Sequence, residues 1–395
     1  MTDIDISPIK IPYENCYGCF ACKNICPTEA ITISDNETGF FRPVIDEKKC
    51  LKCNRCYNLC TTIHSNDLLY PIYTYAGRSQ NEKTIMNSSS GGVFTELANW
   101  ILDNSGIVYG CSYGNKKISH ISIRKKRDLY LLQGSKYVQS YLGDCFKEIE
   151  TNLKNNHYVL FSGTPCQVNS LRVFLKRDYD KLFLVDLFCH GVPSQAMFWD
   201  YISYLERKYK DNIRVFEFRG KYLGWSESFR ILFNKHYEIK GPALRSSFYR
   251  LFLDSSINNE SCTNCRFKSV FRSGDVSIGD CWGINDTHGI AFHEGASSIF
   301  VNSSKGKFLI DELLLNKKIF LKEQDIQFFV RNNSGALEEQ DKSINYDNYV
   351  SLWMENGYKS IEKKYQQKYK YRILRNIIAG FFPKKVRKIV NRIKL

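Results

Sequence analysis

Two short runs of cysteine near the start of the chain carry its clearest chemical signal. They hold eight of the fifteen cysteines, each spaced C-x2-C-x2-C-x3-C, with Pro27 after the first run and Thr61 after the second. In this spacing, three thiolates wrap one face of a [4Fe–4S] cluster and the fourth ligates a partner cluster. We therefore expect two clusters, one held by Cys16, Cys19, Cys22 and Cys60 and the other by Cys50, Cys53, Cys56 and Cys26.

Disulfides and zinc are the alternatives for these runs. The opening sequence MTDIDISPIK has no apolar signal region, and cysteines packed this closely would strain a disulfide framework. Tetrahedral zinc sites usually take two cysteines from each of two knuckles rather than four from one run. Iron–sulfur clusters fit the spacing better than either alternative.

Four later cysteines form a weaker pattern. Cys166 and Cys189 each follow a predicted strand, and Cys262 and Cys265 form a C-x2-C pair. They are a plausible third cluster site, although zinc or chance would leave the same pattern. Cys281 is a spare cysteine in this scheme, and the isolated Cys111 and Cys145 are expected to be buried structural thiols.

The elements that must position these cysteines alternate between strand and helix. After short strands at 30–33 and 41–45, the sequence predicts a strand at 73–76 and a helix from Val93 to Leu102. Residues 157–161 and 182–188 read as buried strands, each followed by a turn and a helix. Such units place their turns at the carboxyl edge of an open sheet, where ligands collect.

Two polar stretches could bind a phosphate or a ring edge. The Ser90-Gly91-Gly92 turn opens the 93–102 helix and presents backbone N–H groups at a helix N-terminus. The stretch 133–140 combines a glycine, a cation, an aromatic ring and amides. An ordinary capped loop and an exposed loop with a solvated lysine are the alternatives.

His190 follows Cys189 directly. A histidine there could move a proton near neutral pH, although such residues more often cap a turn.

Several ordered motifs together resemble one family. These are Ser90-Gly91-Gly92, Gly163-Thr164-Pro165-Cys166-Gln167, Cys189-His190-Gly191-Val192-Pro193-Ser194, Phe218-Arg219-Gly220-Lys221 with Gly224-Trp225, the Cys262–Cys265 pair and Gly279-Asp280. From about residue 73 to residue 320 the chain resembles the family of coenzyme F420 hydrogenase/dehydrogenase beta subunits.

The resemblance implies an iron–sulfur flavoprotein with a third cluster on Cys166, Cys189, Cys262 and Cys265. It also implies FAD bound by the two polar stretches and the turn after the 157–161 strand. The residues expected to contact FAD are Ser90, Gly91, Gly92, Gly134, Ser135, Lys136, Tyr137, Gln139, Gly163, Thr164, Pro165 and Gln167. Related bacterial proteins tend to carry an aromatic residue at position 281, so Cys281 is not expected to be a ligand.

A flavin beside clusters joins two-electron to one-electron chemistry. We therefore expect an oxidoreductase that passes electrons between clusters and FAD to reduce or oxidise an organic substrate or a deazaflavin-like coenzyme. Its donor would be ferredoxin or another redox protein. The catalytic candidates are His190, Lys136, Arg219 and Lys221; the last two would hold an anionic substrate or be a solvated strand end. The alternatives are an electron-transfer adaptor that serves a separate catalytic partner and a zinc-stabilised scaffold.

The expected fold class is α+β to α/β. We expect a two-cluster ferredoxin-like module at 1–66, a flavin-binding region at 67–152, a region with the third cluster site at 153–325, and a helical region at 326–395. With 43% hydrophobic residues and no apolar run long enough to span a bilayer, we expect a soluble protein. Cysteines used as metal ligands imply a reducing compartment, so we expect it in the cytoplasm.

The net charge of +15 is concentrated in the tail, because residues 363–395 hold twelve Lys or Arg and no Asp or Glu. Apolar residues recur there at intervals of three and four, which is typical of a helix on an anionic membrane surface. Docking on the protein or a partner is the alternative, and nucleic acid is disfavoured because no recognition module precedes the tail. A membrane-facing tail would suit a lipid-linked or cell-envelope precursor as substrate.

Overall fold

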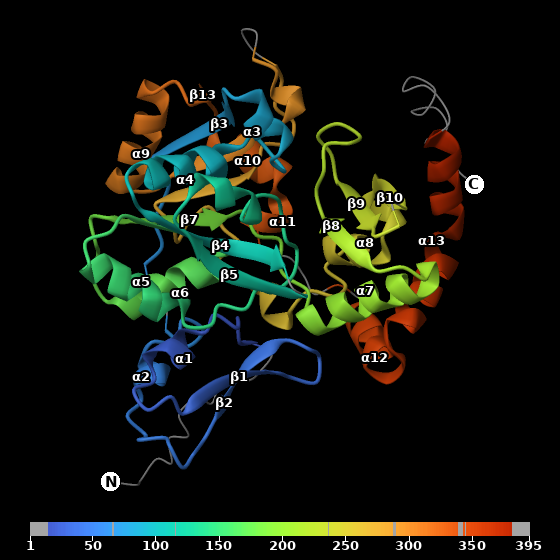
Figure 1. Ribbon diagram of the computed structural model, residues 1–395, viewed down its shortest axis with the longest axis horizontal. Coiled ribbons are helices and arrows are strands. Elements are labelled where there is room, and N and C mark those ends of the chain that lie inside the picture. Colours follow the sequence, from blue (N-terminus) through green and yellow to red (C-terminus); the bar gives the residue numbers. More distant parts are fainter. Residues whose placement is uncertain are drawn as a thin grey trace.

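The computed structural model describes residues 15–64, 67–114, 116–235, 237–286, 290–338, 343 and 345–380, with side chains through residue 375. Figure 1 shows a cysteine-rich module at the N-terminal end, a lobe built on a large sheet, and a second lobe in which helices surround a small sheet.

The module consists of two short helices and one antiparallel hairpin. Strands β1 (Ile31–Asp35) and β2 (Phe41–Ile45) pair with each other, and helices α1 (Ala21–Ile25) and α2 (Arg55–Asn58) carry the cysteine runs. The residues before the helices, Phe20 and Asn54, have left-handed φ values of 63° and 56°. These turns bend each cysteine run sharply, as a run that wraps one cluster must do. A ferredoxin-type module with two short strands was predicted and is confirmed.

The large sheet has eight strands in the order β13-β3-β12-β11-β7-β6-β4-β5. Its centre is parallel, because β11, β7, β6 and β4 run in one direction, and its outer strands are antiparallel. The strands are β3 (Tyr73–Ser79), β4 (Ile107–Gly114), β5 (Lys117–Ile123), β6 (Val159–Gly163), β7 (Leu182–Leu187), β11 (Val276–Asp280), β12 (Ser297–Val301) and β13 (Ile319–Glu323). The regions expected at 67–152 and 153–325 thus both contribute strands to one sheet.

Helices cover both faces of this sheet (Figure 1). On one face, α4 (Val93–Asp103) and α9 (Ser304–Leu315) pack their apolar residues on β7, β11 and β12. On the other face, α5 (Cys145–Lys154) and α6 (Pro165–Leu175) pack on β4, β6 and β7. Phe20 and Leu59 of the module join this second core, so the module docks directly under α5 and α6. The shorter helices of the lobe are α3 (Glu82–Met86), α10 (Ile326–Asn332) and α11 (Ser334–Leu337).

The second lobe follows β7 and was not anticipated as a separate core. Its sheet has the order β10-β9-β8, and its core is rich in aromatic residues. The elements are β8 (Ile213–Glu217), β9 (Ser228–Phe233), β10 (Glu238–Pro242), α7 (Gln195–Tyr209), α8 (Ser247–Leu253), α12 (Tyr346–Asn356) and α13 (Tyr358–Gly380). Ser194 caps α7 by accepting a hydrogen bond from the Met197 N–H at 3.2 Å.

The first part of the basic tail is docked on this lobe. Tyr358, Ile361 and Tyr365 of α13 are at most 1% exposed. The Tyr365 hydroxyl donates to the Leu244 carbonyl at 2.6 Å. Docking on the protein therefore accounts for the start of the tail, whereas residues 381–395, and the side chains of 376–380, lie outside the described residues.

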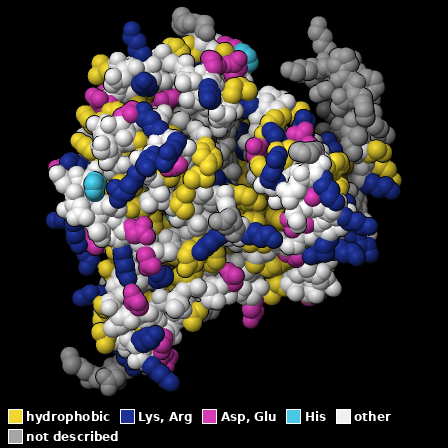
Figure 2. Space-filling model, viewed as in Figure 1, with side chains coloured by type: hydrophobic (Ala, Val, Ile, Leu, Met, Phe, Trp, Pro, Cys, Tyr) yellow, Lys and Arg dark blue, Asp and Glu magenta, His cyan; other side chains and the backbone are white. Residues whose placement is uncertain are grey.

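Lys and Arg side chains are spread over the visible face of both lobes (Figure 2), with a gathering near α7 and α13 at the right. Across the described residues, no helix is both long and apolar enough to span a membrane.

Candidate redox site

The first group of cysteines lies where the module meets the large lobe. The thiols of Cys16, Cys19, Cys22 and Cys60 are close enough to influence one another's ionisation. Burial raises the pKa of Cys19 to about 12 and that of Cys22 well above its ordinary value. Uncompensated thiolates are costly in such a place, so the group favours a positively charged partner such as iron.

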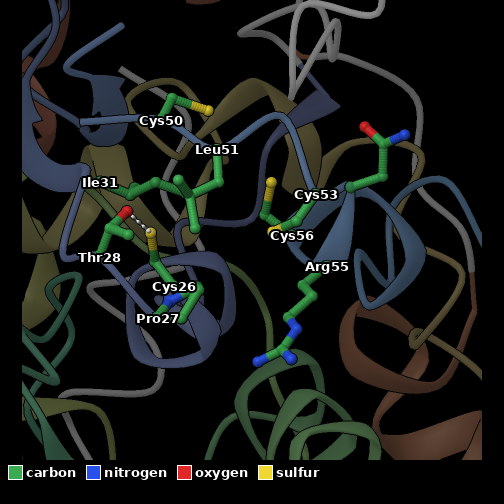
Figure 3. Close-up of a pocket in the computed structure, with 10 residues that line it drawn as sticks. Cys26, Pro27, Thr28, Ile31, Cys50, Leu51, Cys53, Arg55 and Cys56 are labelled. Atoms are coloured by element: carbon green, nitrogen blue, oxygen red, sulfur yellow. Dashed lines mark hydrogen bonds between the residues drawn. The ribbon is translucent and has the colours of Figure 1, made fainter. Parts of the chain in front are cut away.

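The second group lies at the outer end of the module. Figure 3 shows the sulfur atoms of Cys26, Cys50, Cys53 and Cys56 around one pocket. Burial opposes ionisation of Cys26, but hydrogen bonds from the Thr28 backbone and hydroxyl outweigh it and lower the pKa. Cys53 is exposed. The fourth cysteine of the first run thus joins the first three of the second run, which is the exchange expected from the spacing.

The third group gathers four cysteines that are far apart in the sequence. Cys166 is at the start of α6, Cys189 follows β7, and Cys262 and Cys265 come from one loop. The thiols of Cys265, Cys189 and Cys262 are close enough to Cys166 to raise the pKa of its thiol. All four cysteines line one cavity. Cys281 is fully buried elsewhere, in a cluster with Phe292 and Phe300.

Each of the three groups offers four cysteine sulfur atoms. Four thiolates, each bound to a different iron, are the ligand set of a [4Fe–4S] cluster. The residues present therefore fit [4Fe–4S] clusters.

Two side chains connect the first group to the third. Tyr17 follows Cys16 in the sequence. Burial raises the pKa of its hydroxyl, and the nearby thiols of Cys265, Cys166 and Cys262 raise it further. Asn259 donates to the Cys16 carbonyl at 3.3 Å, and its own carbonyl accepts from the Cys262 N–H at 2.8 Å. The module is thus fastened beside the third group.

A buried ion pair holds the loop of the third group in place. Arg272 and Asp186 are both fully buried and 2.8 Å apart. Asp186 also accepts from the backbone N–H groups of Ser273 and Gly274 at 2.8 and 2.9 Å. Because Asp186 belongs to β7, the pair ties the segment after Cys265 to the strand that precedes Cys189.

A cavity of about 660 Å³ adjoins the third group. It lies at the carboxyl ends of β6, β7 and β11, the edge where an open α/β sheet collects ligands. Its size is within the usual range for small-molecule and cofactor pockets. Both polar stretches predicted from the sequence line it, together with Gly163, Thr164, Pro165, His190 and Arg219.

The two polar stretches meet through one serine. The Ser89 hydroxyl accepts from the Ser135 N–H at 3.0 Å and lies 3.0 Å from the Ser135 hydroxyl. Gly134 and Gly92 have positive φ values of 77° and 80°, which favour glycine. The turn around residue 134 therefore lies against the turn that opens α4, as the prediction of a shared ligand requires.

Some of the residues predicted to contact FAD form hydrogen bonds within the protein. The Gly91 N–H donates to the Ser297 hydroxyl at 3.1 Å, and Gly91 is absent from the cavity lining. The side chains of Thr164 and Gln167 form the capping box of α6. The Gln167 amide also donates to the Ser140 hydroxyl at 3.0 Å. These residues shape the wall of the cavity more than they offer free groups to it.

Lys136 and His120 face the cavity with unused hydrogen-bonding capacity. Lys136 donates to the carbonyls of Leu131 and Gln133 at 3.3 and 2.7 Å, and burial lowers its pKa to about 8. His120 Nε2 lies 3.0 Å from the Ser162 carbonyl, so Nε2 carries the proton. His120 Nδ1 is then a buried acceptor that has no partner among the described residues.

Arg219 and Lys221 are not the solvated strand end that the sequence left open. Arg219 is 8% exposed and is paired with Asp280 at 2.7 Å. Lys221 donates to the carbonyls of Ile85 and Ser90 at 2.6 and 2.7 Å. The interpretation as a solvated strand end is wrong because these carbonyls and Asp280 take up both cations inside the protein. Their observed contacts hold the turn that contains Ser90.

His190 is also held by internal partners. Its Nε2 lies 3.0 Å from the Leu253 carbonyl and 3.1 Å from the Ser255 hydroxyl. Its ring contacts Phe252 edge-on, with centroids 5.4 Å apart. These contacts fit a histidine that caps a turn better than one that carries a proton.

Several residues of the site had no signal that stood out in the sequence. His120 is a lone histidine on a strand, and Tyr249 comes from a segment outside the motifs. Trp282 follows the Gly279-Asp280 motif by two residues but is not part of it. Cys111 was expected to be merely structural, yet it lines the cavity beside Lys136. Only the folded sheet and the second lobe bring these residues to one place.

Comparisons with known proteins agree with this arrangement. Residues 157–327 match the family described as the C terminus of the coenzyme F420 hydrogenase/dehydrogenase beta subunit. Residues 15–63 match the 4Fe-4S dicluster domain. These matches confirm the resemblance that was recognised from the motifs, over the residues that each family describes.

The matches to two curated relatives extend beyond the region of this chain that the family describes. A coenzyme F420-dependent sulfite reductase from Methanocaldococcus jannaschii is 24% identical over 95% of this chain, and the chain spans 58% of that protein. The F subunit of the F420H2 dehydrogenase from Methanosarcina mazei is 19% identical over 76% of this chain and 83% of its own length. A chain of the F420-reducing [NiFe] hydrogenase complex from Methanosarcina barkeri aligns with a TM-score of 0.48 and 14% identity, over 72% of this chain and 93% of that one.

Proposed function

We propose that this protein is an iron–sulfur flavoprotein oxidoreductase with three [4Fe–4S] clusters and FAD in the cavity. The observation that carries the proposal is the convergence of four distant cysteines beside a cofactor-sized cavity, with the dicluster module docked next to them. When bound, clusters pass single electrons and a flavin exchanges a pair, which joins one-electron carriers to two-electron chemistry.

The three cysteine groups run from the surface to the interior. The second group includes the exposed Cys53, the half-buried cysteines of the first group lie where the module meets the large lobe, and the third group lines the cavity. This order supports electron exchange with an external carrier at the second group and with the organic cofactor at the third.

The surface around the second group fits an acidic redox protein such as ferredoxin. Leu51 is 67% exposed beside Cys53. The exposed stretch 46–55 holds four cations, two anions and this apolar residue. A cationic rim around an apolar centre steers acidic partners and then offers a contact that excludes water.

The cavity offers groups that suit a flavin dinucleotide. The unpartnered His120 Nδ1 can accept from a ring N–H, and Lys136 can face a phosphate. The buried Tyr249 hydroxyl and Ser261 hydroxyl also have no partner among the described residues, and both residues line the cavity. Orphaned polar groups of this kind imply a ligand that satisfies them.

The substrate proposal follows from the relatives. Both curated relatives are named for coenzyme F420, so we take a deazaflavin-like coenzyme as the first candidate and another organic substrate, including a cell-envelope precursor, as the second. An electron-transfer adaptor is the second candidate function, because the other relative is named as one subunit of a dehydrogenase.

Reduction of the reconstituted holoprotein separates these functions. The protein, purified without oxygen, is reduced with an acidic ferredoxin and mixed with oxidised coenzyme F420 or with candidate envelope precursors. Turnover by the chain alone supports the enzyme. If the bound flavin is reduced but no substrate is turned over, and turnover appears once a partner from a pull-down is added, the adaptor is selected.

For the location, we propose a cytoplasmic protein whose residues 376–395 contact an anionic membrane surface. The support is the sequence pattern alone, since the preceding part of α13 is docked on the protein. Removal of 376–395 should abolish co-sedimentation with phosphatidylglycerol vesicles. Binding that is unchanged by the deletion would exclude this role.

A further inference from the structure

Arg42 is a buried cation at the boundary between the first and third cysteine groups. It is 3% exposed although it lies on the short strand β2. It lies on a surface hairpin, where a solvated side chain would be the ordinary outcome. Its burial therefore needs an explanation.

The contacts of Arg42 place it against Cys16. Its Nη1 donates to the Phe41 carbonyl at 3.0 Å, and its Nη2 donates to the Asn259 side-chain oxygen at 2.8 Å. The other side-chain atom of Asn259, Nδ2, donates to the Cys16 carbonyl. Both acceptors of Arg42 are neutral oxygens, so these hydrogen bonds leave its charge uncompensated.

The Nε–H group of Arg42 is buried and has no acceptor among the described residues. Burial lowers the pKa of Arg42, and Cys16 is the strongest of the groups that counter it, ahead of Tyr346, Cys262 and Glu260. The guanidinium charge is thus close enough to thiols of two different groups to interact with them electrostatically.

Gln139 adds a second unused donor at the same place. Its Oε1 accepts from the Phe41 N–H at 2.9 Å, which fixes Nε2 on the opposite side of the amide. Nε2 is buried without a partner among the described residues, 2.3 Å from where a Cβ on Gly18 would be. Gly18 lies between Cys16 and Cys19 and has a φ of 62°. The absent side chain at position 18 leaves room for the amide to approach the first group.

We propose that Arg42 and Gln139 are redox-positioning residues that raise the reduction potential of the cluster on Cys16, Cys19, Cys22 and Cys60. The inference rests on the proposed function, since it requires that cluster. A thiolate-ligated cubane is anionic and gains negative charge on reduction, so a buried cation and an N–H donor favour the reduced state. Net charge and hydrogen bonds to sulfur are the known means by which a protein sets cluster potential.

The consequence is a difference between the two clusters of the module. The second group has exposed Cys53 and solvated cations, whose fields water and salt screen. Arg42 acts where that screening is weak. The inner cluster should therefore be reduced before the outer one.

The test is an EPR-monitored redox titration of the anaerobic holoprotein. In Arg42→Gln, the ratio of reduced to oxidised inner cluster at fixed potential should fall about tenfold, equal to a shift of about 59 mV for one electron. Arg42→Lys should lie near the wild type because it keeps the charge. Gln139→Glu keeps the acceptor for Phe41 but removes the donor, and should shift the same cluster in the same direction.

Arg55→Gln is the matched control, because it removes an exposed cation beside the second group and should leave the inner potential unchanged. Arg42→Gln with full iron content and wild-type potentials would overturn the inference. Loss of iron in both Arg42→Gln and Arg42→Lys would also overturn it, since the role would then be structural rather than electrostatic. A wild-type protein without iron would instead refute the proposed function itself.

Discussion

The ring of Tyr17 packs edge-on against the ring of Phe267, with centroids 5.4 Å apart. Tyr17 follows the first cysteine of the module, and Phe267 lies two residues after Cys265 of the third group. This contact joins two cysteine groups that belong to separate segments of the sequence. It also covers the sulfur atoms near the cavity, because Tyr17 lines that cavity.

Removal of the Tyr17 ring should expose the clusters to oxygen. In Tyr17→Ala, we expect visible absorbance to bleach in air several-fold faster than in the wild type, because water and oxygen gain access to the third group. Tyr130→Ala removes a ring that is 67% exposed and far from the cysteines, and should bleach at the wild-type rate. Equal rates for all three proteins would show that Tyr17 does not shield the clusters.

The pair of Arg272 and Asp186 should be a major determinant of stability. Removal of one member leaves the other charge buried alone, so Arg272→Ala should lower the free energy of unfolding by about 3–5 kcal/mol. Urea denaturation under anaerobic conditions measures this change. Iron content should fall by the amount of one cluster, since the Cys262–Cys265 loop loses its anchor.

Lys305→Ala is the comparison for that variant. Lys305 pairs with Asp178, whose side chain is 68% exposed, so its loss should cost at most about 1 kcal/mol. Similar losses in both variants would contradict a special role for the buried pair.

The affinity for FAD should depend on the charge of Lys136. Burial lowers the pKa of this amine to about 8 in the ligand-free cavity. The amine is therefore mostly charged at pH 7 and mostly neutral at pH 9, and affinity for the diphosphate should fall as the pH rises through 8. Titration of the apoprotein by flavin fluorescence measures this, and Lys136→Met should flatten the profile. A pH dependence that survives in Lys136→Met would assign it to another group.

The link between the two polar stretches should strengthen flavin binding. Ser89→Ala removes the acceptor of the Ser135 N–H, and a typical hydrogen bond contributes about 1 kcal/mol. The dissociation constant for FAD should then rise about fivefold. Ser226→Ala changes a half-buried serine outside the cavity lining and should leave the dissociation constant unchanged. An unchanged dissociation constant in Ser89→Ala would refute the link.

Electron uptake should depend on the cations around the second group. The double variant Lys49→Glu with Lys52→Glu should slow reduction by an acidic ferredoxin about tenfold at low salt, with the difference vanishing at high salt. Lys317→Glu with Lys318→Glu makes the same charge change at an exposed turn on another part of the protein. If the two double variants behave alike, electrons do not enter at the second group.

The cysteine groups could be predicted because the sequence features that define them are short spacings or positions at the ends of predicted strands. The exchange of Cys26 and Cys60 between runs follows from spacing, and the edge that gathers Cys166 and Cys189 follows from two strand–turn–helix units. The turns around Gly92 and Gly134 were likewise found where glycine permits positive φ.

The partners of long side chains could not be anticipated in the same way. Lys221 is bound by the carbonyls of Ile85 and Ser90, and backbone acceptors leave no trace in composition. Arg42 lies in the short strand β2, and its Nη2 donates to Asn259, a residue more than two hundred positions away. The second lobe was missed because its core combines residues 197–257, from the middle of the sequence, with residues 346–369 of helices α12 and α13 near its end.

The most direct test of the whole account is chemical analysis of the protein purified without oxygen. Three clusters require about twelve iron and twelve acid-labile sulfide per chain, accompanied by one flavin. The account predicts a brown protein with these contents, whose iron falls by about one third when Cys166 and Cys189 are both replaced by serine. A colourless protein that binds zinc but neither iron nor sulfide would contradict it.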